Sequence, residues 1–304
     1  MRFAISIPQY VAGGEFDPDG LRAYLARAEE LGFGSAWTLE QVLGTSSHLN
    51  PAETMAYAAA CNARLRLGCA VFVSTLHSPV HLAKSISTLD QLSRGRIEVG
   101  VAIGGPRMFS AFGIDAGGLA ARFTEGVELM KACWTQPEIT FQGRFWQLDG
   151  AAMEPKPFQK PYPPLWFGGS HPAALRRAVR HGDGFFGAGS TTTAAFADQV
   201  RAVREALAEQ GRDAASFRIA KRVYIAVDDD NGRARQRMAA SLERVYGEAG
   251  KRLMPVAVTG APEECVRGLR EVADAGAGLI LLNPLFDDAA QMERLAAEVL
   301  PGIR

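Results

Sequence analysis

The sequence has no excess of charge of either sign, because 33 basic residues balance 33 acidic residues. A protein that binds nucleic acid through bulk charge needs a basic excess to neutralise phosphates. The composition therefore argues against a nucleic-acid partner. Long hydrophobic runs are also missing: no apolar stretch approaches the ~20 residues that cross a bilayer, and residues 1–10 lack the apolar core of a signal peptide. We therefore expect a cytoplasmic protein with no membrane association.

Cysteine is scarce, and its spacing lacks the pattern of a metal site. None of the four cysteines forms a CxxC pair, and no histidine pair lies beside one of them. Zinc sites in proteins need such clustered ligands. We therefore predict no metal site, and we expect four reduced, buried thiols. The four are Cys61, Cys69, Cys133 and Cys265.

Short apolar runs alternate with amphipathic stretches from one end of the chain to the other. In the stretch after the third run, Leu82, Ile86 and Leu89 recur at helical spacing, and Pro79 occupies a favoured first helical position. Similar patterns follow most of the runs, so the sequence predicts strands that alternate with helices. The predicted strands span residues 2–8, 34–38, 67–74, 96–103, 164–168, 184–187, 218–227 and 278–282.

Eight strand–helix units predict parallel pairing with right-handed crossovers and close into a (β/α)8 TIM barrel, which commonly has about 250 residues. The alternative, an open doubly wound sheet, needs a GxGxxG turn after its first strand, and this chain has QYVAGGEFD there. Residues 135–163 break the rhythm with proline, glycine and aromatic residues, which is typical of an excursion with a small hairpin. We therefore predict an α/β protein with a single domain, residues 1–304: a (β/α)8 barrel with an insertion, residues 135–163, between strands 4 and 5.

Glycine-rich loops follow several of the predicted strands. In a (β/α)8 barrel, function lies at the carboxyl ends of the strands. Residues 168–172 (GGSHP) and 187–190 (GAGS) lie between a strand and a helix start, where free backbone N–H groups and the helix dipole favour a phosphate. Residues 103–107 (IGGPR) form a third corner, against which a flat ring fits. Tight turns need glycine too, so each loop alone leaves a purely structural role open.

Acid–base side chains are sparse near these loops. Glu40 and Gln41 follow the second strand, and we treat them as candidate catalytic residues. His77 is interpreted as lining its corner, and His48 as a loop residue at the surface. No Ser–His–Asp order or HExxH motif is compelling. Phosphate sites with few acid–base groups indicate a cofactor that brings its own chemistry, as a flavin-like ring does.

One charged pair has a simpler interpretation. Arg122 and Glu125 are three residues apart on one predicted helix. This spacing favours a structural ion pair, worth about 0.3 kcal/mol when it is exposed. We therefore assign the pair no role in the chemistry.

Four segments of the chain resemble the bacterial-luciferase-like oxidoreductases, in particular the branch that uses FMN or the deazaflavin coenzyme F-420. Three of them are LGFGSAWTLEQ, RFTEGVELMKACW and PYPPLWFGGSHPAALRRAVRHGDGF. The most specific segment is RLRLGCAVFVSTLHSPVHLAKSISTLDQLSRGRIEVGVAIGG. The resemblance covers nearly the whole chain, and it implies a (β/α)8 barrel with an insertion, in agreement with the count of strands.

The resemblance also implies roles for individual residues. A non-proline cis peptide bond at Ala70–Val71 would support the ring of the cofactor from behind, and the backbone of Gly104 and Gly105 would border this ring. The loops after the fifth and sixth strands would hold the phosphate of the cofactor. The residues of these two loops are Gly168, Gly169, Ser170, Gly187, Ala188 and Gly189.

The chain departs from the family after its second strand. Many members that use the deazaflavin carry Asp-His there, and the histidine serves as an acid or base. This chain has Glu40 and Gln41 at the matching positions. Because glutamine does not transfer a proton at neutral pH, Glu40 is the remaining candidate for the acid–base role.

The resemblance leads to a flavin-type oxidoreductase that acts on a small molecule. Our first hypothesis is hydride transfer between coenzyme F-420 and an organic substrate. The second is a two-component monooxygenase that uses FMN, O2 and a separate reductase. A non-catalytic flavin-binding barrel and a barrel that metabolises a sugar phosphate are alternatives of other classes. Family members are often dimers, which implies a homodimer. Aromatic residues of the mouth loops indicate an apolar or aromatic substrate: Tyr10, Phe109, Phe112 and Phe286.

Overall fold

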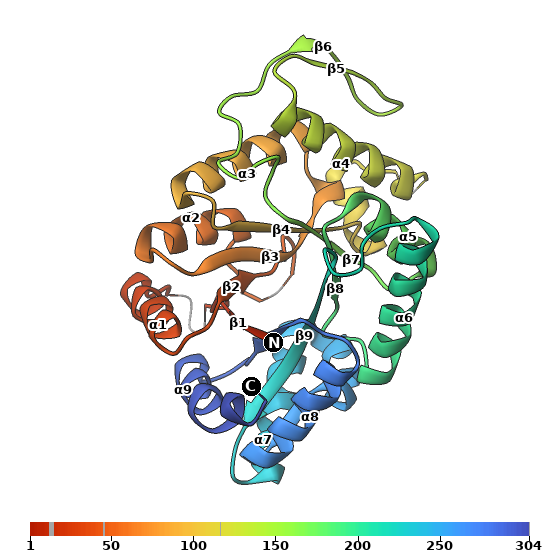
Figure 1. Ribbon diagram of the computed structural model, residues 1–304. Helices are drawn as coiled ribbons and strands as arrows, with labels where there is room; N and C mark the ends of the chain where they lie inside the picture. The colour runs from red at the N-terminus through yellow and green to blue at the C-terminus, as the bar shows by residue number, and fades with distance from the viewer. Residues whose placement is uncertain (12–14, 45, 116, 304) are drawn as a thin grey trace.

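Eight parallel strands close into a barrel within the residues that the structure describes. The structure is a computed structural model, and it describes residues 1–11, 15–44, 46–115 and 117–303. Each barrel strand pairs in parallel with its neighbours, and the last strand pairs with the first, which confirms the predicted (β/α)8 barrel (Figure 1). In ring order the strands are β1 (Arg2–Ser6), β2 (Ser35–Thr38), β3 (Arg66–Val73), β4 (Ile97–Ala102), β7 (Leu165–Gly168), β8 (Gly184–Gly187), β9 (Arg218–Val227) and β11 (Leu279–Asn283).

Helices connect the strands and surround the ring (Figure 1). Several begin with proline, as the pattern at Pro79 predicts, because the fixed φ of proline suits the first helical turn and its missing N–H is not needed there. In the described ranges, we find no helix with the length and apolar character needed to traverse a membrane. The α-helices are α1 (Pro18–Glu30), α2 (Pro51–Cys61), α3 (Pro79–Ser93), α4 (Leu119–Thr135), α5 (Pro172–His181), α6 (Thr193–Glu209), α7 (Asn231–Tyr246), α8 (Pro262–Asp274) and α9 (Asp288–Arg294). Short turns of 3-10 or π type span Ser74–Leu76, Pro106–Phe112, Gly247–Arg252, Met254–Val256, Leu295–Val299 and Leu300–Gly302.

A hairpin lies between the fourth and fifth barrel strands, where the insertion is predicted. Its strands, β5 (Ile139–Gln142) and β6 (Gln147–Ala151), pair antiparallel and lie outside the ring, at the top of Figure 1. Glu125 of α4 holds the turn of this hairpin. Its carboxylate accepts hydrogen bonds from the backbone N–H groups of residues 144–146, at 2.7 to 3.0 Å.

The predicted ion pair between Arg122 and Glu125 is wrong. The Glu125 carboxylate is occupied by the three N–H groups of the hairpin turn. Arg122 lies over the ring of Trp146, with its guanidinium carbon 4.6 Å from the ring centre, which is a cation–π contact. Both side chains therefore anchor the insertion to α4, and helical spacing alone does not reveal such a tertiary contact.

A short strand, β10 (Val258–Gly260), is an element that the sequence pattern does not predict. It pairs in parallel with residues 225–227 at the carboxyl end of β9. A run of three residues that ends in glycine is too short to carry a periodic signal. β9 has ten residues. Its last three pair with neither of its barrel neighbours, β8 and β11, and form the edge along which β10 pairs.

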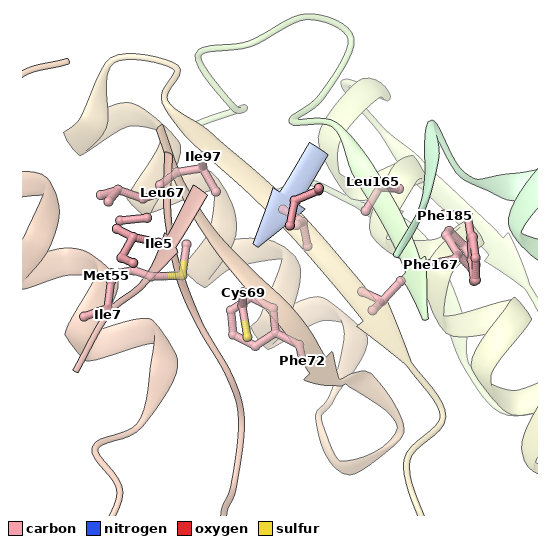
Figure 2. Close-up of a cluster of buried hydrophobic side chains, with 14 of the residues drawn as sticks. Ile5, Ile7, Met55, Leu67, Cys69, Phe72, Ile97, Leu165, Phe167 and Phe185 are labelled. Carbon is pink, nitrogen blue, oxygen red and sulfur yellow. The ribbon is translucent and has the colours of Figure 1, made fainter. Parts of the chain in front are cut away.

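The largest of three hydrophobic clusters lies between the outer faces of the strands and the helices. Figure 2 shows part of it, where Met55 of α2 lies beside Ile5 of β1 and Leu67 of β3. All three side chains are fully buried. Burial of a side chain of this size stabilises the fold by roughly 1.5–3 kcal/mol. The alternation of the strand residues thus directs one set of side chains to the helices.

A second cluster fills the inside of the barrel. Trp37, Trp166 and Phe186 meet edge to face, with ring centres 5.0 to 6.1 Å apart. Trp166 donates its indole N–H to Glu98 at 2.7 Å, and Arg66 lies 2.6 Å from the other oxygen of this carboxylate. These side chains fill the barrel below its carboxyl end. A functional site is therefore expected in the loops at that end and not inside the barrel.

Candidate active site

The third barrel strand carries a bulge near the carboxyl end of the barrel. The register of β3 against β4 shifts within residues 69–72, and the Ala70–Val71 peptide bond in this segment is cis, as the family resemblance implied. A Cβ on Gly100 or Gly168 would lie 3.0 or 3.3 Å from a methyl group of Val71. The bulge therefore packs against β4 and β7 at points where these strands have glycine.

Two partners hold Glu40 beside this bulge. Glu40 follows β2, and its side chain is 1 % exposed. Its Oε2 accepts a hydrogen bond from the backbone N–H of Val73 at 2.5 Å. Its Oε1 lies 2.7 Å from Nε2 of His77, whose side chain is 30 % exposed. A buried carboxylate therefore orients an imidazole that reaches the surface of the protein.

Gln41 belongs to a different set of contacts. Its Nε2 donates to the hydroxyl of Ser46 at 2.9 Å, and this hydroxyl donates to the carbonyl of Val245 at 3.3 Å. These bonds tie the loop after β2 to the last turn of α7. Gln41 makes no hydrogen bond to Glu40 or His77.

Gly104 and Gly105 form the loop after β4. Gly104 has a φ of 83°, and a Cβ there would lie 2.3 Å from a methyl group of Val73, so this position requires glycine. Gly105 is exposed, and no described atom lies within 4 Å of the point that its Cβ would occupy. The loop after β4 therefore packs one glycine against Val73, next to the bulge, and leaves the other without a neighbour at its Cβ position.

Gly168, Gly169 and Ser170 lead from β7 to α5. Gly169 has a φ of 147°, and its Cβ would lie 2.8 Å from a side chain in the first turn of α5. The backbone N–H groups of Gly169 and Ser170 make no hydrogen bond to another described residue. His171 caps the helix by accepting from the N–H of Ala173 at 3.2 Å. Free N–H groups at the start of a helix are suited to an anion.

Gly187, Ala188 and Gly189 lead from β8 to α6. A Cβ on Gly187 or Gly189 would lie 2.7 or 2.8 Å from a neighbouring side chain, so both positions require glycine. Lys221 of β9 donates from Nζ to the carbonyls of Ala188 and Thr191, at 2.5 and 2.8 Å. Lys221 is 2 % exposed, and burial lowers its pKa to about 7. A buried amine therefore fixes the shape of this loop.

The predicted site residues thus gather at one end of the barrel, with Gln41 apart from the rest. One group surrounds the bulge, and the two candidate phosphate loops follow the adjacent strands β7 and β8. In the parts of the chain that the structure describes, no group of three His, Cys, Asp or Glu side chains is placed to hold a metal ion. The group around the bulge consists of Glu40, Ala70, Val71, Gly104, Gly105 and Gly168.

Known proteins resemble the chain over nearly all of its length. The family model described as luciferase-like monooxygenase matches residues 1–278. The chain belongs to the luciferase-like monooxygenase family. An F-420-dependent glucose-6-phosphate dehydrogenase from Beutenbergia cavernae is 28 % identical to it over 97 % of this chain and 96 % of that protein.

Two solved structures share the fold of this luciferase-like chain. The monooxygenase RslO1 from Streptomyces bottropensis superimposes with a TM-score of 0.84 and 25 % identity, over 100 % of both chains. An F-420-dependent secondary alcohol dehydrogenase, in complex with an F-420–acetone adduct, superimposes with a TM-score of 0.84 and 19 % identity, over 100 % of this chain and 99 % of that one. The second likeness concerns the fold alone.

Two residues of the luciferase-like barrel have contacts that the sequence analysis missed. His77 was interpreted as lining its corner, but it contacts Glu40 across two adjacent strand ends. The available signal was that both residues follow neighbouring strands of a predicted barrel. Lys221 and Arg222 lie side by side in the middle of β9, and a pair of basic residues within a barrel strand was the signal for the bond of Lys221 to the loop after β8.

A small cavity opens at the same end of the luciferase-like barrel, and it changes the interpretation of His48. His48 lies in a loop, as expected, but it is half-buried: its Nδ1 atom is buried, the residue lines the cavity, and burial lowers its pKa. Tyr10 also lines the cavity. Phe109 is buried, and Phe286 packs in a side cluster. The expected aromatic lining therefore rests on Tyr10 and not on these two side chains.

Proposed function

We propose that this chain transfers hydride between the deazaflavin coenzyme F-420 and a small organic substrate. The family and the names of full-length relatives support this, since those relatives are F-420-dependent dehydrogenases. The observation that carries the proposal is the position of the Glu40–His77 pair beside the bulge at Ala70–Val71. This arrangement combines a pair that can carry a proton with an open cradle lined by glycine.

The residues present fit such a coenzyme. The bulge at Ala70–Val71 offers a surface on one side, and Gly105 adds no side chain to the space beside it. The free N–H groups of Gly169 and Ser170, with the dipole of α5, offer a site for a phosphate. The loop at residues 187–189 forms a second wall for the same phosphate.

A bound F-420 supplies the hydride chemistry itself. Oxidation of an alcohol to a carbonyl also releases a proton, and we assign this proton to His77. If Nε2–H of His77 donates to ionised Glu40, Nδ1 is left as the proton acceptor. The N–H of Val73 keeps the carboxylate in place, so the imidazole is held in one orientation. In the reverse reaction, the same nitrogen returns the proton.

Titration of the purified protein with F-420 and, separately, with FMN tests the proposal. We expect saturable binding of F-420 at one site per chain, followed by absorbance and fluorescence. Addition of a substrate alcohol should then bleach the absorbance of the oxidised coenzyme. Binding of FMN without any affinity for F-420 would refute the first assignment. Binding of either cofactor without turnover across a broad panel of substrates would favour a non-catalytic barrel.

A second candidate function is a two-component monooxygenase. The observation that favours it is the likeness to the monooxygenase RslO1 over the whole of both chains. In this case a separate reductase supplies reduced FMN. We would then expect O2 uptake that depends on reduced FMN and on an organic substrate. A protein that binds F-420 and leaves O2 unconsumed excludes this function.

We also propose that residues 1–304 act as one functional unit, located in the cytoplasm, and that two copies form a homodimer. The barrel closes with strands from both ends of the chain, because β1 pairs with β11. Light scattering of the purified chain measures the mass of the assembly. A monomer at all concentrations would contradict the dimer.

A further inference from the structure

An open groove lies between α4 and α5 on the outside of the barrel, with the end of β5 along its edge (Figure 1). The insertion belongs to the chain that leads from α4 to the next barrel strand, β7. The groove has a volume of about 770 Å3. A groove of this size accommodates a sizeable part of an organic ligand.

One stripe of residues from each helix forms the walls of the groove. Both stripes follow the spacing i, i+3, i+4, i+7, which places residues on one face of a helix. Three arginines lie on the stripe of α5, so this wall is basic over about two helical turns, or about 10 Å. The stripe of α5 consists of Ala173, Arg176, Arg177 and Arg180, and that of α4 consists of Ala121, Thr124, Glu125 and Glu128.

The three arginines have no carboxylate partner among the described residues. Arg176 and Arg180 are exposed. Arg177 is half-buried, and its guanidinium carbon lies 5.8 Å from the ring centre of Phe123, which is a neutral partner. Burial lowers the pKa of Arg177. Because a guanidinium presents a planar fork of donors that matches a carboxylate or a phosphate, this wall is suited to an anionic ligand.

The two carboxylates of the opposite wall have partners of their own. Glu125 accepts from three N–H groups of the hairpin turn. Glu128 lies 3.7 Å from Nδ1 of His181. The pKa of His181 is nevertheless lowered, first by burial and then by the charges of Lys131 and of two groove arginines. Positive charge therefore dominates this part of the groove.

The groove begins beside the candidate phosphate loop. Ala173 lies in the first turn of α5, three residues after Ser170. Gly169 and Ser170 offer free N–H groups to a phosphate at the same end of this helix. A ligand that is held there by an internal phosphate can therefore continue along the basic wall of α5.

The two candidate coenzymes differ on the far side of this phosphate. FMN ends at its phosphate, whereas F-420 continues as a chain of glutamate residues with several carboxylates. We propose that the groove between α4 and α5 binds this glutamate chain, with its carboxylates on Arg176, Arg177 and Arg180. The inference rests on the proposed function. It means that the protein distinguishes F-420 from FMN by the glutamate chain as well as by the ring.

Two forms of the coenzyme test the role of the glutamate chain. Fluorescence titration compares F-420 that carries several glutamates with F-420 that carries none and keeps the ring and the phosphate. We expect the wild type to bind the form with glutamates about tenfold more tightly, since several exposed charge contacts are gained. The difference should shrink at high salt, because exposed charges are then screened. A difference that does not depend on salt would contradict binding by the arginines.

Two exposed arginines test the location of the glutamate chain. The double variant Arg176→Gln with Arg180→Gln should keep its melting temperature and lose most of the tenfold preference, while the form without glutamates binds as before. Glu128→Gln should have the opposite effect and tighten the form with glutamates severalfold, because it removes a negative charge from the groove. Arg235→Gln is the matched control, since Arg235 is also exposed on a helix and has no ion pair among the described residues, but lies on α7.

The outcomes separate this inference from the proposed function. No binding of either form of F-420 would end the proposed function and this inference with it. Equal affinity for the two forms would leave the proposed function in place and end this inference alone. A preference for the form with glutamates that persists in the double variant, with an unchanged melting temperature, would place the glutamate chain elsewhere and also refute the inference.

Discussion

Nε2 of His77 lies 2.7 Å from Oε1 of Glu40, and this contact joins the ends of two adjacent barrel strands. The other carboxylate oxygen of Glu40 accepts from the N–H of Val73, which follows the bulge of β3. The backbone that shapes the bulge therefore also orients the Glu40–His77 pair. A substitution at Glu40 should therefore disturb both the position of the Val73 backbone and the orientation of His77.

The Glu40–His77 pair leads to a prediction about turnover. Glu40→Gln keeps the shape of the side chain but removes the charge that orients the imidazole. We expect kcat to fall by about 10²-fold, the usual contribution of a general acid or base, while the affinity for F-420 changes little. Steady-state kinetics and coenzyme titration measure the two effects separately.

A double variant distinguishes a shared role from two separate roles. If Glu40 acts through His77, the double variant Glu40→Gln with His77→Gln should be no slower than His77→Gln alone. Gln41→Ala is the matched control, because Gln41 bonds to Ser46 and not to the pair. A full rate in Glu40→Gln would reduce Glu40 to a structural residue.

Gly105 allows a test of the cradle without damage to the fold. It has extended backbone angles, φ −91° and ψ 150°, which suit valine, and its Cβ would meet no described atom within 4 Å. Gly105→Val should therefore leave the melting temperature unchanged and weaken F-420 binding at least about tenfold, because the side chain enters the space of the ring.

One other glycine provides a control for this variant. Gly34→Ala lies before β2, at the opposite end of the barrel, and should alter neither stability nor affinity. Gly169 is less suited to such a test, because its φ of 147° and its contact with α5 would strain any side chain. Unaltered F-420 affinity in Gly105→Val would move the ring away from this loop.

Lys221 connects the stability of the protein to pH. Burial lowers its pKa to about 7, from 10.5 in the unfolded chain. The unfolded chain therefore binds more protons between about pH 7 and pH 10.5, and stability from this group should rise with pH across that window, by at most about 1.4 kcal/mol per pH unit. Urea denaturation at several pH values should show this slope in the wild type and its loss in Lys221→Met.

Lys221→Met should also loosen the loop at residues 187–189, because two carbonyls lose their shared donor. We expect weaker F-420 binding as a result. Lys131→Met is the matched control: Lys131 also donates to a carbonyl, that of His181, but this carbonyl precedes β8, whereas the loop follows β8. Equal F-420 affinity in both variants would mean that the loop does not hold the phosphate.

Asp288 has the opposite pH dependence. Burial raises its pKa from 3.8 to about 6, so the folded protein binds more protons between these values. Stability from this group should fall as pH rises from about 4 to about 6, and the loss persists at higher pH. Asp288→Asn should abolish this decline and raise stability at pH 7 relative to the wild type, in thermal or urea unfolding. An exposed carboxyl elsewhere in the chain provides a control, since Asp149→Asn should leave the pH dependence between 4 and 6 intact.

The positions of the barrel strands were predictable because each is encoded locally. The run at residues 67–74 coincides with β3 to within one residue at each end, and the proline at residue 79 begins α3 as predicted. The glycine loops after β7 and β8 were also visible, since the turns there require glycine. Such signals depend on a few neighbouring residues, so they can be recognised in the sequence without knowledge of the fold.

The partners of charged and polar side chains were not predictable in this way. Helical spacing pairs Arg122 with Glu125, but the hairpin offers Glu125 three N–H groups that no local pattern shows. His48 is interpreted from the sequence as a loop residue at the surface, yet it lines a cavity formed by distant strands. In each case the competing partner comes from far along the chain.

The amino-acid sequence alone therefore determined the eight-stranded barrel, its glycine-rich loops and the end of the barrel at which they meet. Only the tertiary structure decided that Glu40 holds His77 and that Lys221 holds the loop after β8. The physical reason is that strands and turns follow from short-range preferences of the backbone. Hydrogen-bond partners are chosen when closure of the ring brings distant residues together.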